Sequence, residues 1–243
     1  MKTNPRPLMK TLLVVACAAA ILLPGSTAPA QEANAEGKAH LSFPGEYVRR
    51  VANDQAVVNL GYRTANASVG QKWLMVEISM TVFPGHNMTL KRDDFWLTTP
   101  GGDKVVLATQ EEFNKGSGSV RALDARANIS RDSLNYLPKQ ANIPCRIGFF
   151  SDTSNPDRGL TYTQFSMNPD SFCGGRLYWV IPDGIKLGQH FLNIQLPDQV
   201  MTVPFKIMTK EELKEAKAKV KKWEKEQKAA KKAAKKAAKE QKK

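Results

Sequence analysis

The sequence is poor in the residues on which most metal sites and many enzymes depend. Its 243 residues include only three histidines and three cysteines. His40, His86 and His190 have no cysteine or carboxylate at the spacing of a metal site, and Gly-x-Ser-x-Gly, His-Glu-x-x-His and P-loop patterns are absent. These absences exclude the enzyme classes that such motifs mark. The sequence predicts no catalytic residue, metal ligand or cofactor, although a catalytic site assembled only in the fold stays open.

The chain also lacks an apolar run long enough to cross a bilayer, which takes about 20 residues. The run at residues 11–23 has 13 residues. The small residues Ala28-Pro29-Ala30 follow it, and three basic residues precede it, namely Lys2, Arg6 and Lys10. This order is typical of a secretory signal peptide. We therefore expect residues 1–30 to be removed and the protein to be extracytoplasmic, in the periplasm or secreted, without a transmembrane span after cleavage.

A lipoprotein is the main rival to this interpretation. Val14-Val15-Ala16-Cys17 resembles the sequence at which lipoproteins are processed. Processing at Cys17 would leave only six residues of the apolar run before the cysteine, and the remaining apolar residues would follow the cysteine without a role in export. We therefore favour cleavage before Gln31 over lipid attachment at Cys17.

The positive charge of the chain belongs to its ends. The formal net charge is +13. Residues 207–243 hold 15 Lys and 6 Glu, a net charge of +9, and the signal region adds +3. Residues 31–206 therefore carry about +1, so the high isoelectric point is not a property of the central domain.

Residues 208–243 are predicted to form a long C-terminal α-helix. Thr209 and Glu212 fit a capping box, no glycine or proline follows, and alanine and lysine are strong helix formers. An apolar stripe at heptad spacing then fades into alanines; its first members are Leu213, Ala216, Val220 and Trp223. A short, marginal coiled coil and docking against the main domain both stay open.

The lysine-rich tail is the best candidate for a binding function in the sequence. Its KKAA repeats shift by about 40° every four residues, so positive charge surrounds the helix. Only alanine lies between the lysines, so contact with polyanions would be electrostatic. The candidate partners are anionic envelope polymers, lipid headgroups and extracellular DNA, and the alternative is a solvated helix that binds nothing. The candidate polyanion-binding residues are Lys221, Lys222, Lys228, Lys231, Lys232, Lys235, Lys236 and Lys239.

Residues 41–207 are predicted to form an all-β domain, an antiparallel immunoglobulin-like sandwich, after a flexible leader over residues 31–40. Lys72–Val82 alternates strictly between two faces, which predicts a half-buried strand. Turn residues between Asp94–Thr99 and Lys104–Thr109 predict a hairpin. Short strands separated by turns are typical of a sandwich.

A loop-rich insertion at about residues 114–174 interrupts this domain. Asn114–Ser119 (NKGSGS) is predicted to be a loop, and a short helix is expected at Arg131–Leu137. The insertion holds Cys145 and Cys173, an even pair in an exported chain, which favours a disulfide over two buried free thiols. Two cysteines alone cannot complete a zinc site.

The strand and turn pattern resembles the immunoglobulin-like, telokin-like extracellular domains of exported bacterial proteins. The matching residues are Lys72–Val82, then Asp93-Asp94-Phe95-Trp96-Leu97 before Gly101-Gly102-Asp103-Lys104, and Arg176–Val180 before Pro182-Asp183-Gly184. The resemblance covers about 100 of the 243 residues, and the insertion departs from it. It implies a binding or envelope role and carries over no site residue.

These observations favour an exported, non-enzymatic protein associated with the cell envelope. Its tail would be an electrostatic tether, and its sandwich would contact a protein or a glycan. A structural or assembly module is the first alternative, and a flat surface would favour it. An enzyme is the second, and a deep pocket lined by His86 or His190 with carboxylates would favour it.

Overall fold

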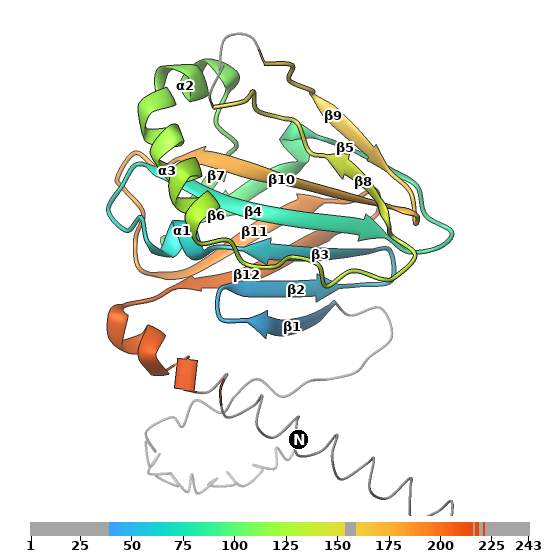
Figure 1. Ribbon diagram of the computed structural model, residues 1–243, viewed down its shortest axis with the longest axis horizontal. Helices are drawn as coiled ribbons and strands as arrows, with labels where there is room; N and C mark the ends of the chain where they lie inside the picture. The colour runs from blue at the N-terminus through green and yellow to red at the C-terminus, as the bar shows by residue number, and fades with distance from the viewer. Residues whose placement is uncertain (1–38, 154–158, 216, 219–220, 222–243) are drawn as a thin grey trace, which may run out of the picture. The chain divides into compact units, whose positions relative to one another are not determined.

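Antiparallel β-structure dominates the part of the chain that the computed structural model describes, residues 39–153, 159–215, 217–218 and 221 (Figure 1). The largest sheet has six strands in the order β1 (His40–Gly45), β2 (Val48–Ala52), β3 (Ala56–Gly61), β4 (Trp73–Val82), β10 (Ser171–Val180) and β8 (Ile143–Arg146). A second sheet has the order β12 (Val200–Ile207), β11 (Gly188–Gln195), β6 (Phe95–Thr98) and β7 (Lys104–Val106). A two-stranded sheet pairs β5 (Met88–Lys91) with β9 (Gln164–Met167).

One continuous cluster of buried apolar side chains joins the two larger sheets. It includes Ile78 of β4 and Trp179 of β10 from the first sheet, and Leu97 of β6 and Leu192 of β11 from the second. The predicted hairpin is confirmed, because β6 and β7 pair in antiparallel register. The arrangement is consistent with the predicted all-β sandwich.

The long alternating strand is confirmed in position, but its predicted half-burial is wrong. β4 is buried on both faces along almost its whole length. Its apolar face packs in the core, whereas Glu77, Ser79 and Thr81 on the other face make polar contacts with the insertion, to Arg131, Leu134 and Ser171 respectively. Period-two alternation therefore arose from two buried environments, one apolar and one polar, and not from core against solvent.

The insertion contains helices where a loop was expected. Two helices, α2 (Gln110–Lys115) and α3 (Ser117–Ile129), lie at its start. The loop prediction for Asn114–Ser119 is therefore wrong. A short further helix, α1 (Arg63–Asn66), lies outside the insertion, between β3 and β4. Thr109 and Glu112 form a capping box that begins α2. The chain passes close to Trp73 between the two helices, because a Cβ on Gly116 would lie 2.2 Å from the Trp73 ring.

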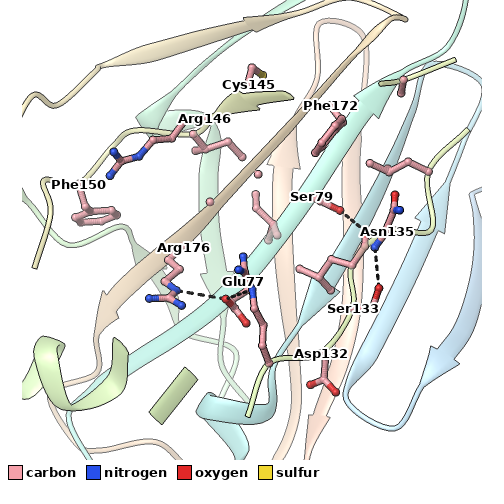
Figure 2. A pocket seen from close by; sticks show the side chains of 18 of the residues that line it. Glu77, Ser79, Asp132, Ser133, Asn135, Cys145, Arg146, Phe150, Phe172 and Arg176 are labelled. Carbon is pink, nitrogen blue, oxygen red and sulfur yellow. Dashed lines mark hydrogen bonds and ion pairs between the residues drawn. The ribbon is translucent and has the colours of Figure 1, made fainter. Parts of the chain in front are cut away.

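The short helix expected at Arg131–Leu137 is also wrong, because this segment is not helical. The backbone carbonyls of this segment instead accept hydrogen bonds from side chains of the six-stranded sheet (Figure 2). The Leu134 carbonyl accepts hydrogen bonds from Ser79 Oγ at 2.6 Å and Asn59 Nδ2 at 3.0 Å. The Tyr136 carbonyl accepts one from Arg50 Nε at 3.0 Å. These tertiary contacts compete with the backbone bonds that a helix would need.

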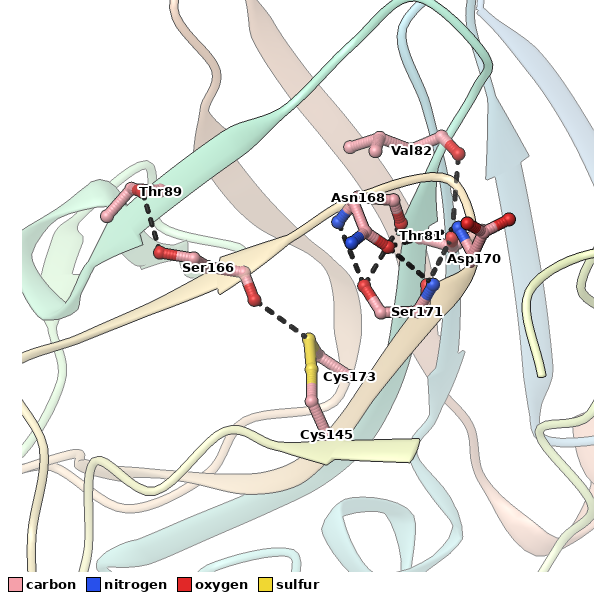
Figure 3. The surroundings of a disulfide bond; sticks show 9 residues. All are labelled: Thr81, Val82, Thr89, Cys145, Ser166, Asn168, Asp170, Ser171 and Cys173. Carbon is pink, nitrogen blue, oxygen red and sulfur yellow. Dashed lines mark hydrogen bonds between the residues drawn. A yellow bond between two sulfur atoms is a disulfide. The ribbon is translucent and has the colours of Figure 1, made fainter. Parts of the chain in front are cut away.

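The predicted disulfide between Cys145 and Cys173 is present (Figure 3). It joins β8 to β10, and the two cysteines are partners in the strand register. This pair of strands is parallel, which departs from the purely antiparallel arrangement expected. The turn before β10 is fixed by Thr81, whose hydroxyl donates to the Ser171 carbonyl at 2.6 Å, and by Asn168 Oδ1, which accepts from the Ser171 amide at 3.0 Å.

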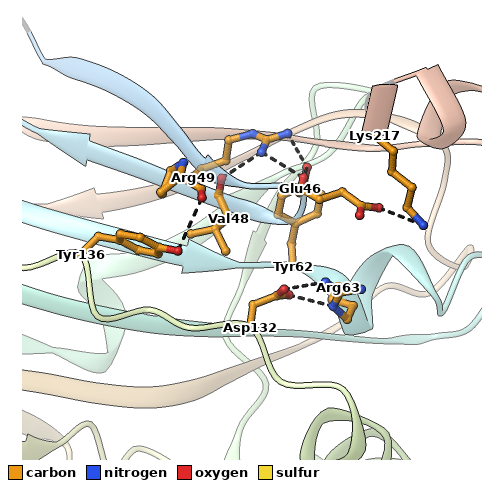
Figure 4. A network of polar contacts seen from close by, with 9 residues as sticks. Glu46, Val48, Arg49, Tyr62, Arg63, Asp132, Tyr136 and Lys217 are labelled. Carbon is orange, nitrogen blue, oxygen red and sulfur yellow. Dashed lines mark hydrogen bonds and ion pairs between the residues drawn. The ribbon is translucent and has the colours of Figure 1, made fainter. Parts of the chain in front are cut away.

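The tail begins as predicted. Thr209 Oγ1 accepts a hydrogen bond from the Glu212 amide at 3.2 Å, and Glu212 accepts one from the Thr209 amide at 3.1 Å. Lys217 lies 3.6 Å from Glu46 (Figure 4). Lys221 is helical and exposed. The other seven candidate lysines lie outside the described residues. Separately, no helix among the described residues is long and apolar enough to span a membrane.

Candidate functional site

A cleft of about 1160 Å³ lies on the outer face of β4 and β10 (Figure 2). Its floor is formed by these two strands, and its walls come from the insertion. One wall is the segment at residues 131–142, and the other runs from β8 to residue 153, with the end of α3 closing part of the site. The insertion therefore creates the cleft by standing above the sheet on both sides.

Two successive glycines of β10, Gly174 and Gly175, lie in the floor of the cleft. A Cβ on Gly174 would have only the Ile78 carbonyl oxygen within 4 Å, at 3.7 Å, so the space above this glycine is open. Gly175 has the opposite role, because a Cβ there would lie 2.7 Å from the Ile147 carbonyl oxygen. Gly175 faces the core side of β10, where it lets Ile147 pack closely, and Gly174 leaves the space above the cleft floor open.

A charged network lies in the floor beside this opening. Arg176 Nε is 3.3 Å from Glu77 Oε1, and Arg176 Nη1 is 2.9 Å from Asp124 Oδ1. Arg176 also donates to Asn128 Oδ1 at 2.6 Å, and Arg131 lies 3.4 Å from Glu77. One guanidinium thus bridges carboxylates from β4 and α3, which fixes the helix above the sheet.

Burial and the neighbouring carboxylates shift the pKa values of two members of this network, Arg176 and Tyr178. Burial lowers the pKa of Arg176, but the carboxylates of Asp124 and Glu77 outweigh it and leave the pKa raised. Burial, reinforced by Asp124, raises the pKa of Tyr178 far above its usual range, so its hydroxyl stays neutral and donates to Asp124. Arg176 and Tyr178 therefore act as fixed hydrogen-bond donors to the carboxylates of the network.

The 131–142 wall is attached from behind by a second polar network (Figure 4). Arg63 makes two hydrogen bonds to Asp132, at 2.9 and 2.6 Å, and its guanidinium lies 4.3 Å from the centre of the Tyr47 ring. The bidentate geometry gives both affinity and orientation. Together with the Leu134 contacts, it fixes the wall over β3 and β4.

The candidate residues named from the sequence do not converge on this cleft, except for the disulfide. Cys145 lines it. His190 does not; it is buried, stacks on Phe205 at 5.4 Å between ring centres, and its Nδ1 lies 3.1 Å from the Gly188 carbonyl oxygen. His86 lies in a turn outside the cleft lining. Among the described residues, no cluster of histidine, cysteine and acidic side chains is suited to hold a metal ion.

Sequence reasoning missed the cleft residues themselves. One signal was available: Glu77 and Arg176 are the single charged residues of two strands and are opposite in sign, and such charges are rarely buried without a partner. They pair across β4 and β10 in the strand register. Comparisons with known proteins add nothing to this site, because no family model, no curated protein and no solved structure matches the chain.

Proposed function

We propose that this chain is an exported, non-enzymatic binding protein whose sandwich domain holds a glycan in the cleft. The observation that carries the proposal is the cleft, with its volume of about 1160 Å³ and its mixed polar and apolar lining. Sites for small ligands occupy roughly 300–1,000 Å³. This cleft has room for a short run of sugar units rather than for a single one.

A saccharide suits this lining better than a peptide does. Each sugar hydroxyl both donates and accepts a hydrogen bond, and the hydroxyl and amide side chains of the lining, Ser133, Asn135 and Asn142, can do both as well. A peptide also needs partners for its backbone amides. The floor strands are paired with each other along β10, so neither offers a free edge there for strand addition.

The immunoglobulin-like topology and the extracytoplasmic location belong to the same proposal. The disulfide between Cys145 and Cys173 supports the location, because such bonds persist mainly in oxidising compartments. The strand and turn pattern around β4, β6 and β10 supports the topology.

The lysine-rich tail is the second part of the proposal, as a long helical tether to anionic envelope polymers or headgroups. Its support is the charge of +9 over residues 207–243 and the capped start at Thr209. Deleting residues 209–243 is expected to lower the salt concentration at which the protein elutes from a heparin column. Elution at an unchanged salt concentration would contradict the tether.

Filling the opening above Gly174 tests the glycan site. Gly174→Trp places a side chain in open space, so the fold is expected to persist while the ligand is blocked. Gly118→Trp is the matched control, because Gly118 is exposed on α3 and has nothing within 4 Å. Binding of cellohexaose, chitohexaose and hexagalacturonate is measured by calorimetry.

We expect at least one of these saccharides to bind the wild type and the Gly118→Trp variant. Binding to Gly174→Trp should be at least about tenfold weaker, a loss of about 1.4 kcal/mol. Melting curves of the two variants establish that both are folded. The proposal fails if the wild type binds none of the three, or if Gly174→Trp binds as tightly as the control.

A further inference from the structure

The carboxylates of the cleft are all engaged by protein groups. Glu77 is paired with Arg176 and Arg131. Asp124 is paired with Arg176 and accepts the Tyr178 hydroxyl. Asp132 is bound by Arg63 from behind the wall, and Asp152, which is the fourth acidic lining residue, also has a partner. Three of the four carboxylates are therefore paired with arginines of the protein.

Two basic side chains of the cleft are not engaged in this way. The lining holds four basic residues, of which Arg176 and Arg131 serve the carboxylates. Arg146 on β8 and Lys139 on the opposite wall segment make no ion pair with the described part of the chain, and both are exposed. Arg146 and Lys139 are therefore the two cations of the lining that are not used in the ion pairs of Glu77, Asp124 and Asp132.

Arg146 is placed to reach a ligand on the open floor. In the parallel pairing of β8 with β10, Arg146 is the register partner of Gly174, and paired residues of neighbouring strands present their side chains on the same face. The Arg146 side chain therefore emerges beside the position that lacks a side chain. Figure 2 shows it extending from β8 towards the part of the cleft where Phe150 lies.

The disulfide holds the backbone from which this side chain extends. Cys145 precedes Arg146 and is bonded to Cys173 in the adjacent strand. The backbone of Arg146 is thus held on both sides, by the bridge and by the Ile147 amide, which donates to the Gly174 carbonyl at 2.9 Å. A preorganised guanidinium fork matches the planar, bidentate geometry of a carboxylate.

We infer that the glycan held in the cleft is acidic, a uronate-type saccharide whose carboxylates are bound by Arg146 and Lys139. The inference rests on the proposed glycan-binding function and names the class of ligand for that site. Arg146 is the specificity-determining residue above the floor, and Lys139 supplies a second cationic contact from the other wall. Two contacts on different walls suit a chain with repeated carboxylates.

The test compares hexagalacturonate with its fully methyl-esterified form, which has the same backbone without charge. Calorimetry is performed on the wild type, Arg146→Gln, Lys139→Gln and Lys186→Gln. The last is the matched control, since Lys186 is an exposed cation outside the cleft lining and its loss changes the net charge equally. A hexaglutamate peptide is the probe for the competing class of acidic polymer.

We expect the wild type and Lys186→Gln to bind the acid at least about tenfold more tightly than the ester. A charge-assisted contact corresponds to about ten- to hundredfold in affinity, so Arg146→Gln should lose most of this preference and Lys139→Gln part of it. Affinity for the ester should not change in either variant. The preference should also weaken as salt concentration rises.

The outcomes separate the inference from the function on which it rests. Equal binding of acid and ester overturns the acidic assignment and leaves the glycan site standing. Equal loss of preference in all three variants, including Lys186→Gln, overturns the roles of Arg146 and Lys139. Tighter binding of hexaglutamate than of hexagalacturonate overturns the assignment to a saccharide, and failure of every saccharide to bind overturns the proposed function itself.

Discussion

Removing the disulfide tests how the β8 wall of the cleft is held. In Cys145→Ala/Cys173→Ala, β8 keeps its short parallel ladder and the hydrogen bonds of Asn142 and Ile143 to the Asp170 carbonyl, each at 2.8 Å. Four-residue strands with so few partners fray easily. We expect the sheet to fold and the wall around Arg146 to loosen.

The size of the effect follows from the length of the loop that the bridge closes. The cysteines are 28 positions apart, and the chain-entropy relation gives about 3.5 kcal/mol for a loop of this length. For a domain of 150–250 residues, each kcal/mol changes the melting temperature by about 2–4 °C. The double variant should therefore melt about 7–14 °C below the wild type.

Calorimetric melts of both proteins, with and without reductant, provide the measurement. Reductant should lower the melting temperature of the wild type to that of the variant and leave the variant unchanged. Hexagalacturonate affinity should fall in the same samples, because Arg146 follows Cys145 directly. A difference in melting temperature below about 2 °C, or two alkylatable thiols in the native unreduced protein, would refute the reasoning.

Three further substitutions probe the insertion and the core. Ser79→Ala removes the donor to the Leu134 carbonyl, and chemical denaturation should show a loss of about 1–2 kcal/mol. Gly116→Ala places a Cβ 2.2 Å from the Trp73 ring, and the same assay should show a loss of about 1–3 kcal/mol. Burial lowers the pKa of His190 despite an opposing backbone hydrogen bond, so the unfolded chain binds the proton more readily. Its contribution to stability should be complete above about pH 6.5 and should decrease as the pH falls below that value, and His190→Phe should remove this component of the pH dependence.

Each of these three predictions has an internal comparison. Gly118→Ala, where nothing lies within 4 Å, should leave stability unchanged or slightly raised, and an equal loss at Gly118 would contradict the steric argument for Gly116. Ser133→Ala changes an exposed serine of the same wall, whose Oγ accepts only a long hydrogen bond of 3.4 Å from the Asn135 amide, and should be close to neutral. Identical pH profiles for the wild type and His190→Phe between pH 5 and 7.5 would exclude the role given to His190.

The elements that could be predicted from the sequence are those whose signals are local. The alternation of Lys72–Val82 and the turn between Asp94–Thr99 and Lys104–Thr109 each lie within a few residues, and β4 and the β6–β7 hairpin form there. The capping box at Thr209 and Glu212 is equally local. In each case backbone preference and tertiary packing favour the same structure.

The errors arose where distant residues decide the local structure. Gly116 and Gly118 favour a loop by propensity, but Val120 and Leu123 are buried and hold α3 in a helical conformation. The segment after α3 has helix-compatible residues, yet its carbonyls accept hydrogen bonds from the sheet. The residues of the segment itself do not indicate that distant side chains of the sheet will bind its carbonyls.

The cleft was invisible for the same reason. Its charged floor unites Glu77, Asp124 and Arg176, which are separated by about fifty residues each along the chain. Only the pairing of β4 with β10 and the return of α3 over them bring these residues together. A sequence gives the residue types, whereas the site depends on the strand order.

The parallel pairing of β8 with β10 has a consequence for how the chain folds. β10 is synthesised after β8 and has β4 as its other neighbour, so β8 has no sheet partner until β10 has docked. Pairing of strands distant in sequence is slow, because the chain loses the entropy of loop closure before the stabilising contacts form. We therefore expect β8 to join its sheet together with β10 or after it, and the wall around Arg146 to be completed only once the bridge between Cys145 and Cys173 has formed.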